Sequence, residues 1–491
     1  MEKPLSELGL TPRGGQDVSV TGLSVDSRKT AEGHLFAALP GTRVHGAEFI
    51  TYALRMGAAA ILTDAEGAEI ARDVIAEHSP ALIVTEDPRA ALAGAAALYY
   101  GVQPEVMVAV TGTNGKTSVA SFTRQLWTLL GYSAANIGTT GVEGAFTAPS
   151  AHTTPEPITL HALLAEMAGH GVTHAAMEAS SHGLDMRRLD GVRLKAAGFT
   201  NFSQDHLDYH GSFDAYFDAK AQLFDRVLPV DGTAVLNMDD AKAQVLRELV
   251  AARGQHVLTV GRQEGVHLRL LAQRFDATGQ ELRFSFLGKK FTSRLNLIGG
   301  FQAENVAIAA GLAIAGGADS DAVFAAFKDL EGVRGRMQLA AKRDHGAAIF
   351  VDYAHTPDAI ATALAALRPH VLGRVIAIIG AGGDRDAGKR ALMGKAAAEN
   401  ADVVIVTDDN PRSEDPASIR AQVLQGCPEA NEVGDRAEAI LRGVDLLEPG
   451  DTLLITGKGH ETGQIIGDDV LPFDDAEQAS VAVAALEGRL A

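Results

Sequence analysis

Short apolar runs alternate with alanine-rich stretches of helical period along most of the chain. This alternation is typical of parallel sheets covered by helices, so we predict an α/β fold. We expect three domains, over residues 1–97, 98–333 and 334–491. The second domain includes a more β-rich segment, residues 267–297, in which apolar and polar positions alternate.

Polar clusters repeatedly follow the apolar strands. The predicted strands and the clusters after them are VMVAV and TGTNGKTS, THAAM and EASSHG, AAGFT and NFSQDHLDYH, AIFV and DYAHTPD, VIAIIG and AGGDRD, DVVIV and TDDNPR, TLLIT and GKGHE. In open α/β sheets, ligands bind beyond the carboxyl ends of the strands. The pattern therefore predicts ligand sites in both the second and the third domain.

The first cluster has the features of a phosphate-binding loop. Gly112 and Gly115 let the backbone turn its N–H groups toward an anion, and the helix that follows adds the positive end of its dipole. Lys116 can reach terminal phosphates, and the hydroxyl of Thr117 or Ser118 can ligate Mg²⁺. A glycine-rich turn with an exposed lysine is the alternative, but a strand before it and an amphipathic helix after it favour nucleotide binding.

Further candidate ligands follow the next strands. Glu178 and His206 each come soon after a predicted strand, and Lys220 lies in a helical pattern. A carboxylate and an imidazole near terminal phosphates can hold Mg²⁺, which neutralises charge during phosphoryl transfer. Taken singly, each is an ordinary loop or cap residue, and Lys220 a solvated lysine. Together with the phosphate loop they predict a metal site.

The composition limits the kinds of partner that the chain can have. The formal net charge of −19 argues against nonspecific nucleic-acid binding, which requires a basic face. The one cysteine excludes an intramolecular disulfide. No apolar run approaches the ~18 residues of a membrane-spanning helix, and no signal peptide is recognisable. We expect a cytoplasmic monomer that does not insert into membranes.

The polar clusters, taken in order, resemble those of a known enzyme family. TGTNGKTS, EASSHGL, TNFSQDHLDYHGSFDAYFDAK, DYAHTPD, GAGGDRDAGKR, DNPR and GKGHE follow one another as in the Mur ligases. The segment SVDSRKTAEGHLFAALPGTRVHGAEFI is similar to the UDP-binding domain of that family. The resemblance spans nearly the whole chain. It implies an N-terminal domain for a UDP-sugar, a central P-loop ATPase domain with a parallel sheet, and a C-terminal Rossmann-like domain that brings an amino acid.

The resemblance implies an ATP-dependent carbon–nitrogen ligase of bacterial peptidoglycan synthesis. ATP would phosphorylate the terminal carboxylate of UDP-N-acetylmuramoyl-L-alanyl-D-glutamate to an acyl phosphate. The incoming amine would then attack, and a tetrahedral intermediate would expel phosphate. The residues suit this chemistry, because a carboxylate is a poor electrophile until phosphorylation supplies a leaving group. Mg²⁺ and Lys116 would stabilise the developing charge.

The resemblance also implies roles for individual residues. Thr117 and Glu178 would contact one Mg²⁺, and His206 and Lys220 a second, with Lys220 carbamylated to a carboxylate-like ligand. The residues implied to hold ATP are Gly112, Thr113, Asn114, Gly115, Lys116, Thr117, Ser118, Asn305, Arg336, Asp352 and His355. Those implied to bind the UDP-muramoyl peptide are Val25, Ser27, Thr42, Arg43, Val44, Thr153, Thr154, Ser180 and Arg188.

The acidic turn after the strand DVVIV predicts which amino acid is added. In members of the family that add meso-2,6-diaminopimelate, a D-N-P-R motif marks the amino-acid pocket. Arg412 would form a two-pronged contact with the distal carboxylate of diaminopimelate, which lysine as a substrate lacks. Asp409 and Asn410 would receive the distal ammonium. The pocket implied in this way consists of Arg385, Asp409, Asn410, Pro411, Arg412, Gly457 and Glu461.

The chain departs from the family pattern near the UDP-muramoyl peptide. Met186 stands where some relatives have glutamine, and His152 where some have asparagine. Neither departure touches the residues predicted to bind phosphate or metal.

Other functions compete with this interpretation. A lysine-adding ligase and a folylpolyglutamate synthase belong to the same class, but Arg412 and the UDP-like segment argue against both. A P-loop ATPase or small-molecule kinase would turn over ATP without an amino acid and release a stable phosphorylated product. Lys116, Glu178 and His206 disfavour a noncatalytic module that binds a UDP-sugar.

Overall fold

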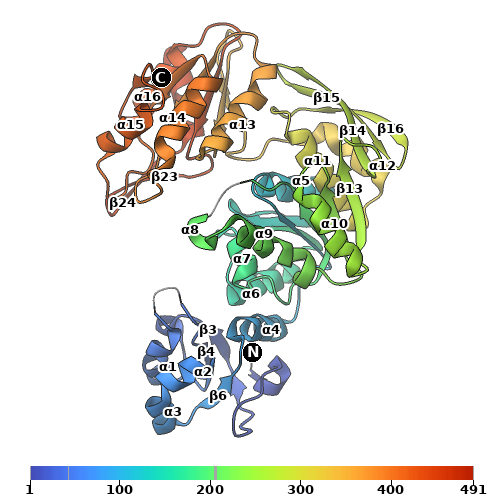
Figure 1. Cartoon of the computed structure of the whole chain (residues 1–491), viewed down its shortest axis with the longest axis vertical. Coiled ribbons are helices and arrows are strands. Elements are labelled where there is room, and N and C mark those ends of the chain that lie inside the picture. Colours follow the sequence, from blue (N-terminus) through green and yellow to red (C-terminus); the bar gives the residue numbers. More distant parts are fainter. Residues whose placement is uncertain (1, 42–43, 204–206, 490–491) are drawn as a thin grey trace. The chain divides into compact units, whose positions relative to one another are not determined.

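The computed structural model describes residues 2–41, 44–203 and 207–489. The chain divides into two compact units, residues 1–266 with 308–323 and residues 267–307 with 324–491 (Figure 1). Both are built from sheets and helices, which confirms the predicted α/β class. The predicted domain bounds at residues 97 and 333 stay predictions. Among the described helices, none has the length and apolar character needed to span a bilayer.

The first unit begins with a four-stranded sheet in the order β3-β4-β5-β6, with all neighbours parallel. Along β4, Leu35 and Ala37 belong to one apolar cluster and Phe36 to another, so both faces of the sheet are buried. The elements of this part are β1 (Lys3–Pro4), β2 (Ser19–Val20), β3 (Gly22–Ser24), β4 (His34–Ala37), β5 (Ala60–Thr63), β6 (Ala81–Val84), α1 (Ile50–Arg55), α2 (Ala65–Ile70), α3 (Arg72–His78) and α4 (Pro88–Tyr100).

A second parallel sheet of this unit runs in the order β13-β12-β11-β7-β10-β8, and β9 pairs antiparallel with β8. The position of β7 in its interior places the phosphate loop between two neighbouring strands. The elements are β7 (Val106–Thr111), β8 (Ala134–Gly138), β9 (Gly141–Gly144), β10 (His174–Glu178), β11 (Leu194–Phe199), β12 (Thr233–Asn237), β13 (His256–Gly261), α5 (Lys116–Leu129), α6 (Pro157–Gly169), α7 (Ser181–Asp185), α8 (Leu207–His210), α9 (Phe213–Gln222) and α10 (Lys242–Ala252).

The segment of alternating polarity forms antiparallel strands in the second unit, β14 (Leu268–Asp276), β15 (Gly279–Phe286) and β16 (Lys289–Leu295). The helices that follow are α11 (Gln302–Ala315) and α12 (Ser320–Ala325). This segment lies in the same compact unit as the C-terminal part of the chain.

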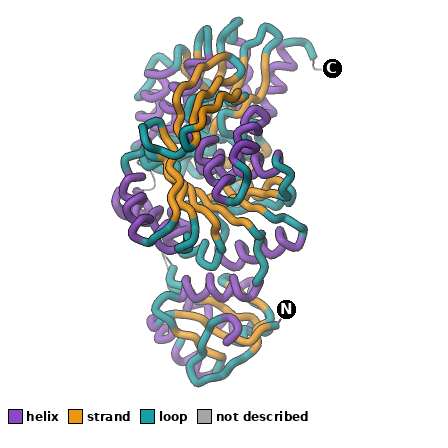
Figure 2. The backbone as a smooth tube through the Cα atoms, turned by 90° about the vertical axis from the view of Figure 1, so that its right-hand side faces the viewer, coloured by secondary structure: helices purple, strands orange, loops and turns teal. Residues whose placement is uncertain are grey.

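The C-terminal sheet has the order β17-β18-β22-β19-β20-β21 and is parallel except for β17. Figure 2 shows strands with helices beside them in the part of the chain near the C-terminus. Its elements are β17 (Gln338–Lys342), β18 (Ala348–Asp352), β19 (Val375–Ile379), β20 (Val403–Val406), β21 (Asn431–Glu432), β22 (Thr452–Thr456), α13 (Pro357–Leu367), α14 (Lys389–Asn400), α15 (Pro416–Leu424), α16 (Arg436–Asp445) and α17 (Asp475–Leu486). A separate hairpin is formed by β23 (Gly463–Ile466) and β24 (Asp469–Pro472).

Helices cover both faces of the C-terminal sheet, which explains its continuous apolar strands. Along β19, Ala377 and Ile379 pack into the cluster that includes residues of α13, α14 and α15. Ile376 and Ile378 pack into the cluster that includes residues of α16 and α17. Because neither face is left for water, the polar residues of this part gather at the strand ends.

One ion pair is wholly buried within this sheet-and-helix core. The side chains of Arg436, at the start of α16, and Asp475, at the start of α17, are both 0% exposed. Arg436 donates to Asp475 through Nε at 2.7 Å and through Nη2 at 2.6 Å. Burial alone would lower the pKa of Arg436, but Asp475 raises it above its usual value. The guanidinium therefore stays charged in the core.

Arg436→Met removes one partner of this pair and leaves the Asp475 carboxylate buried without a cation. We expect the free energy of opening of the C-terminal sheet to fall by about 3–5 kcal/mol. Arg442→Met is the matched control, because Arg442 lies on the same helix and pairs with Glu438 at the surface. It should change stability by less than about 1 kcal/mol. Native-state hydrogen exchange of β20 and β22 measures both effects, and equal changes in the two variants would contradict the assigned role of the buried pair.

Candidate active site

The phosphate loop has the strand, loop and helix that the sequence predicts. Gly112 has φ 145°, and a Cβ there would lie 1.8 Å from the Thr200 hydroxyl, so only glycine fits. Gly115, with φ 88°, precedes the first residue of α5. The segment after β11 braces the loop, because Asn201 accepts from the backbone of Asn114 at 2.9 Å. The loop therefore holds a fixed shape at the N-terminus of α5, where backbone N–H groups favour an anion.

Two lysine side chains meet at one carbonyl oxygen of this loop. The ammonium groups of Lys116 and Lys220 donate to the Gly112 carbonyl at 2.9 and 2.8 Å. Lys220, on α9, is 1% exposed, and its ammonium lies 4.4 Å from the centroid of the Tyr216 ring. The structure thus brings Lys220 to the phosphate loop, as the sequence predicts.

Glu178, at the end of β10, has a fixed carboxylate. Its Oε1 accepts from the backbone N–H of Thr139 at 2.8 Å, and its Oε2 accepts from the Thr139 hydroxyl at 3.3 Å. A Cβ at Gly138 would lie 2.0 Å from Oε1, so a side chain there would displace the carboxylate. Glu178 is only 1% exposed. Each oxygen keeps lone-pair capacity, which suits a carboxylate that ligates a metal ion.

Four residues predicted to bind the UDP-muramoyl peptide lie together beside Glu178. The Thr153 hydroxyl is 3.0 Å from that of Thr139, and the Thr154 hydroxyl is 3.1 Å from that of Ser180. Arg188 donates to the Thr154 carbonyl at 2.8 Å. Burial lowers the pKa of Arg188 from its ordinary value. These contacts join the segment before α6 to the start of α7.

Met186 contacts Arg188, one of these four residues. Arg188 Nη2 lies 3.3 Å from Met186 Sδ, so the thioether sulfur lies beside the guanidinium. Sulfur is a weak hydrogen-bond acceptor, which leaves more of the Arg188 donor capacity for a ligand.

The predicted uridine residues lie after two neighbouring parallel strands of the N-terminal sheet. Val25 and Ser27 follow β3, and Val44 follows β4. Val25 and Val44 are 38% and 48% exposed, whereas Ser27 is buried. The predicted residues Thr42, Arg43 and His206 lie outside the described residues.

Three predicted ATP residues gather at one edge of the C-terminal sheet. Asp352 ends β18, and its carboxylate accepts from the backbone N–H of Met337 at 2.7 Å. Burial raises the pKa of Asp352. The Arg336 guanidinium lies 4.6 Å from the centroid of the Tyr353 ring, and the His355 ring lies 4.6 Å from it. The fourth, Asn305 on α11, is buried and donates to the Gln302 side chain at 3.1 Å.

Three segments converge at the predicted amino-acid pocket. They are the loop after β19 (residues 380–386), the turn after β20 (407–415) and the loop after β22 with the hairpin that follows (457–472). The carbonyl of Asn410 accepts from Gly383 N–H at 2.9 Å, and Gln464 donates to the carbonyl of Asp409 at 2.8 Å. Arg412 N–H donates to the Ile465 carbonyl at 3.1 Å. These bonds make one site from segments far apart in the sequence.

Asp409 presents an unpaired carboxylate in this pocket. The residue is only 7% exposed, and its Oδ2 lies where a Cβ on Gly457 would be 2.3 Å away. In the part of the chain that the structure describes, this carboxylate accepts no hydrogen bond and forms no ion pair. The neighbouring Asp408 points elsewhere and pairs with Arg420. A carboxylate so placed is ready to receive a ligand's ammonium group.

Arg412 has donors to spare. Its Nη1 donates to the Gly383 carbonyl at 2.8 Å, and among the described residues no carboxylate pairs with it. Its backbone has φ 52°, a left-handed conformation that costs a non-glycine residue about 1–2 kcal/mol. Bonds to Ile465 and Gly467 hold it there. The remaining N–H groups can bind a carboxylate in a fork. Of the other predicted residues, Pro411 is buried, Arg385 is exposed on the loop after β19, and Glu461 is partly exposed.

Three residues of the site were missed by sequence reasoning. Thr139 holds Glu178, and Lys458 and His460 lie inside the GKGHE motif between the predicted Gly457 and Glu461. The motif itself was a signal for Lys458 and His460. Thr139 had only its place after an apolar strand, β8.

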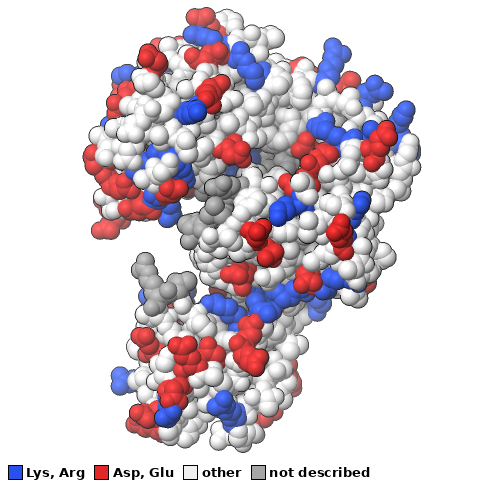
Figure 3. All heavy atoms as spheres, in the orientation of Figure 1, with Lys and Arg blue, Asp and Glu red and all other residues white. Residues whose placement is uncertain are grey.

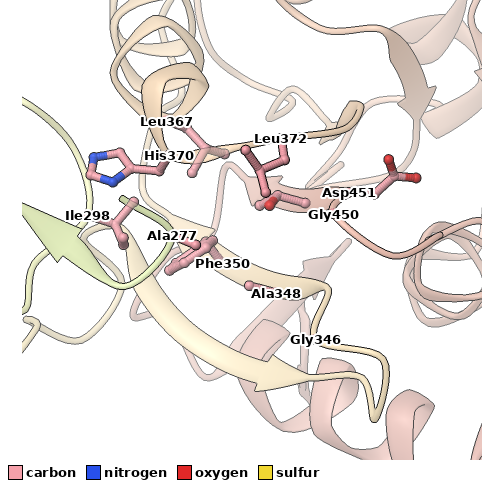
Figure 4. A pocket seen from close by; sticks show the side chains of 11 residues that line it. Ala277, Ile298, Gly346, Ala348, Phe350, Leu367, His370, Leu372, Gly450 and Asp451 are labelled. Atoms are coloured by element: carbon pink, nitrogen blue, oxygen red, sulfur yellow. The ribbon is translucent and has the colours of Figure 1, made fainter. Parts of the chain in front are cut away.

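A small hollow in the second unit is separate from these residues. It has a volume of about 60 Å³, and Ile298, Phe350 and Leu367 are among the apolar residues that line it (Figure 4). It lies at the amino ends of β18 and β22, whereas the candidate site lies at their carboxyl ends. Its acidic residue, Asp451, already accepts from the Arg374 side chain at 2.6 Å. The hollow is therefore not the active site.

Three segments of the chain match domains of one protein family. Residues 19–100 match the Mur ligase family catalytic domain, residues 110–313 the Mur ligase middle domain, and residues 335–459 the Mur ligase glutamate ligase domain. A relative from Caulobacter vibrioides named UDP-N-acetylmuramoyl-L-alanyl-D-glutamate–2,6-diaminopimelate ligase is 50% identical over 99% of both chains. A Bradyrhizobium diazoefficiens protein of the same name is 50% identical over 95% of both.

Solved structures agree with this assignment. A structure of a ligase with that same name covers 99% of this chain and 100% of its own, with 33% identity and a TM-score of 0.73. The MurF ligase of Thermotoga maritima, at 20% identity and a TM-score of 0.63, shares the fold. The chain therefore belongs to the Mur ligase family. It is an ATP-dependent ligase that joins an acid to an amino acid.

His460 gives the fold a defined pH dependence. Burial and the nearby cations Arg336 and Arg334 lower its pKa to about 4. Between pH 6.5 and 4 the unfolded chain therefore binds a proton that the folded chain does not, so stability falls as pH falls. We expect the free energy of unfolding to fall by roughly 2–3 kcal/mol less between pH 7 and pH 4.5 in His460→Gln than in the wild type. Chemical denaturation at pH 7 and pH 4.5 measures it. The exposed His345→Gln is the control and should keep the wild-type slope; an unchanged slope in His460→Gln would refute the assignment.

Proposed function

We propose that this ligase adds meso-2,6-diaminopimelate to UDP-N-acetylmuramoyl-L-alanyl-D-glutamate through an acyl phosphate. The observation that carries the proposal is one pocket with an unpaired buried carboxylate, Asp409, and an arginine with spare donors, Arg412. Diaminopimelate has an ammonium and a carboxylate at its distal end, and these match the two residues in charge. Lysine has only the ammonium there and would leave Arg412 unmatched. The names of the full-length relatives agree with this substrate.

The phosphate loop would serve the first half of the reaction. The N–H groups at the start of α5 and the Lys116 ammonium would bind the terminal phosphates of ATP. Lys116 now donates to the loop's own carbonyls, Gly112 and Thr113, at 2.9 Å, so ATP would draw it from these oxygens to a phosphate. Thr153, Thr154, Ser180 and Arg188 would place the D-glutamate carboxylate beside Glu178 and the loop. Holding acceptor and donor in this geometry lowers the entropic barrier to phosphoryl transfer.

The residues present suit Mg²⁺. Glu178 offers a carboxylate held in place through its Thr139 bonds, and Thr117 is the second residue of α5, the helix that follows the phosphate loop. His206 and a carbamate on Lys220 would contribute to a second ion. Bound Mg²⁺ would neutralise the charge of the transferred phosphoryl group.

The second unit would serve the second half of the reaction. Asp409 and Arg412 would hold the distal end of diaminopimelate and so present its other amine for attack on the acyl phosphate. Glu461, Gly457 and Arg385 complete the pocket in this proposal. The side-chain oxygen of Asn410 already accepts hydrogen bonds from Lys458 and from the backbone of Ile465, which favours a role in fixing these neighbours. Direct contact between Asn410 and the distal ammonium of diaminopimelate stays a prediction. Arg336, Asp352 and His355 would contact ATP.

Several broader properties follow from the proposed reaction. We assign the UDP-sugar to residues 1–97, the ATPase to 98–333 and the amino acid to 334–491. The product would enter peptidoglycan synthesis and so support cell shape and division. The reaction would take place in the cytoplasm, where ATP and UDP-sugars are made, with one chain as the working unit. On the visible face of Figure 3, acidic side chains are spread widely, and some lysine and arginine side chains form a run below the centre. The formal net charge of −19 gives no support for a nucleic-acid partner.

One assay distinguishes the proposed ligation from its alternatives. Full-length protein is incubated with UDP-N-acetylmuramoyl-L-alanyl-D-glutamate, ATP, Mg²⁺ and either meso-diaminopimelate or L-lysine, and products are identified by mass spectrometry. We expect the tripeptide with diaminopimelate, with a kcat/KM at least about 100-fold above that for lysine, because the fork to Arg412 is lost with lysine. Removal of Mg²⁺ with a chelator should stop product formation. A preference for lysine, or ATP turnover that yields a stable phosphorylated product alone, would overturn the proposal.

Arg412→Ala tests the carboxylate contact directly. We expect the KM for diaminopimelate to rise by about 100-fold or more, because a charge-assisted fork is lost, while the KM for ATP changes little. Arg412→Lys should rescue only part of this loss, since an ammonium cannot form the fork. Arg420→Ala is the control, because Arg420 pairs with Asp408 on the other side of the turn. A diaminopimelate KM that stays at the wild-type value in Arg412→Ala would show that another group binds the distal carboxylate.

A further inference from the structure

A buried lysine lies beneath the amino-acid pocket. Lys458 follows β22, and its side chain is 0% exposed. Its ammonium donates to Asn410 Oδ1 at 2.9 Å and lies 3.3 Å from Glu461 Oε2. Burying an ammonium is costly unless it is paired, and an apolar residue would fill a purely structural position at lower cost. The position therefore calls for a reason beyond packing.

Lys458 completes the hydrogen bonding of Asn410. The Asn410 Oδ1 accepts from Lys458 and from the backbone N–H of Ile465, each at 2.9 Å, so both of its lone pairs are in use. The Asn410 amide nitrogen donates to Glu461 Oε2 at 2.9 Å. One asparagine thus joins the turn after β20 to the loop after β22 and to the hairpin. Loss of the ammonium would leave the Asn410 side chain with its bonds to Ile465 and Glu461 alone and so fix it less tightly.

Lys458 also sets the direction of the Glu461 carboxylate. Lys458 and Asn410 both bind Oε2, while Oε1 accepts no hydrogen bond from the described residues. Oε2 is therefore held by two donors, and Oε1 keeps its acceptor capacity for a ligand. The buried cation also offsets part of the negative charge that Asp409 and Glu461 place in the pocket.

We propose that Lys458 is a positioning residue of the amino-acid site, whose buried ammonium fixes Asn410 and Glu461 so that Glu461 Oε1 is set to bind an ammonium group of the incoming amino acid. This inference rests on the proposed function and deepens it. Lys458 touches neither substrate nor reacting atoms. Its effect passes through Glu461, so the two residues should act as one unit toward the amino acid.

Lys458→Met, which keeps much of the side-chain length and removes the charge, tests this role in the full-length enzyme with meso-diaminopimelate. We expect the KM for diaminopimelate to rise roughly 30-fold, with less than about a fivefold fall in kcat and no change in the KM for ATP. In the Glu461→Gln background the same substitution should raise the KM by at most about threefold, because the partner that it positions is already altered. Lys458→Gln, which keeps a donor for Asn410, should have an intermediate effect and serves if Lys458→Met fails to fold.

Ile455→Ala is the matched control for a general loss of stability, since Ile455 is buried on β22. It should lower the melting temperature with an unchanged KM for diaminopimelate. Suppose that the wild-type enzyme forms the product. An unchanged KM for diaminopimelate in the Lys458 variants would then overturn the role of Lys458 and leave the proposed function intact. Increases in this KM that multiply when Lys458→Met and Glu461→Gln are combined would do the same. A wild-type enzyme that forms no product with diaminopimelate would overturn the proposed function, and the role of Lys458 with it.

Discussion

The buried guanidinium of Arg436 is the interaction on which the amino-acid pocket depends. Besides its pair with Asp475, it donates to the backbone carbonyls of Asp408 at 3.2 Å and Thr456 at 2.9 Å. These carbonyls lie just beyond β20 and at the end of β22, where the turn and the loop of the pocket begin. The buried Arg436 guanidinium thus fixes the backbone at the carboxyl ends of β20 and β22. The same guanidinium interacts electrostatically with the Asp409 carboxylate, which offsets part of the cost of burying that charge.

Cationic side chains are bound to backbone carbonyls at the phosphate loop as well. Lys116 and Lys220 both donate to the Gly112 carbonyl oxygen. Near the loop, the Glu178 carboxylate is held by a hydrogen bond from the backbone N–H of Thr139 and packs against Gly138, where a side chain would displace it. In both units the functional groups are placed by backbone contacts at the carboxyl ends of parallel strands, where the ligands of α/β sheets bind.

The sequence predicts much of this architecture because its signals are local. The apolar strands, the glycine pattern of the phosphate loop and the polar clusters at the strand ends are all confirmed as structure. Thr139 could not be placed in this way, because its partner Glu178 lies in another segment. Lys458 lies in a recognisable motif, but its partner Asn410 also lies in another segment. The distance between Lys458 and Asn410 in the chain is large, and only the fold brings them to 2.9 Å. The contrast between Asp408 and Asp409 is similar: adjacent acids look alike in sequence, yet one pairs with Arg420 and the other faces the pocket.

The central claim is that three distant segments form one diaminopimelate site at the carboxyl ends of β19, β20 and β22. Hydrogen exchange measured by mass spectrometry, with and without saturating meso-diaminopimelate, tests it most directly. The account predicts that protection increases in residues 380–386, 407–415 and 457–467, while the amino ends of β18 and β22 exchange as before. Protection at those amino ends, or none in the three segments, would contradict it.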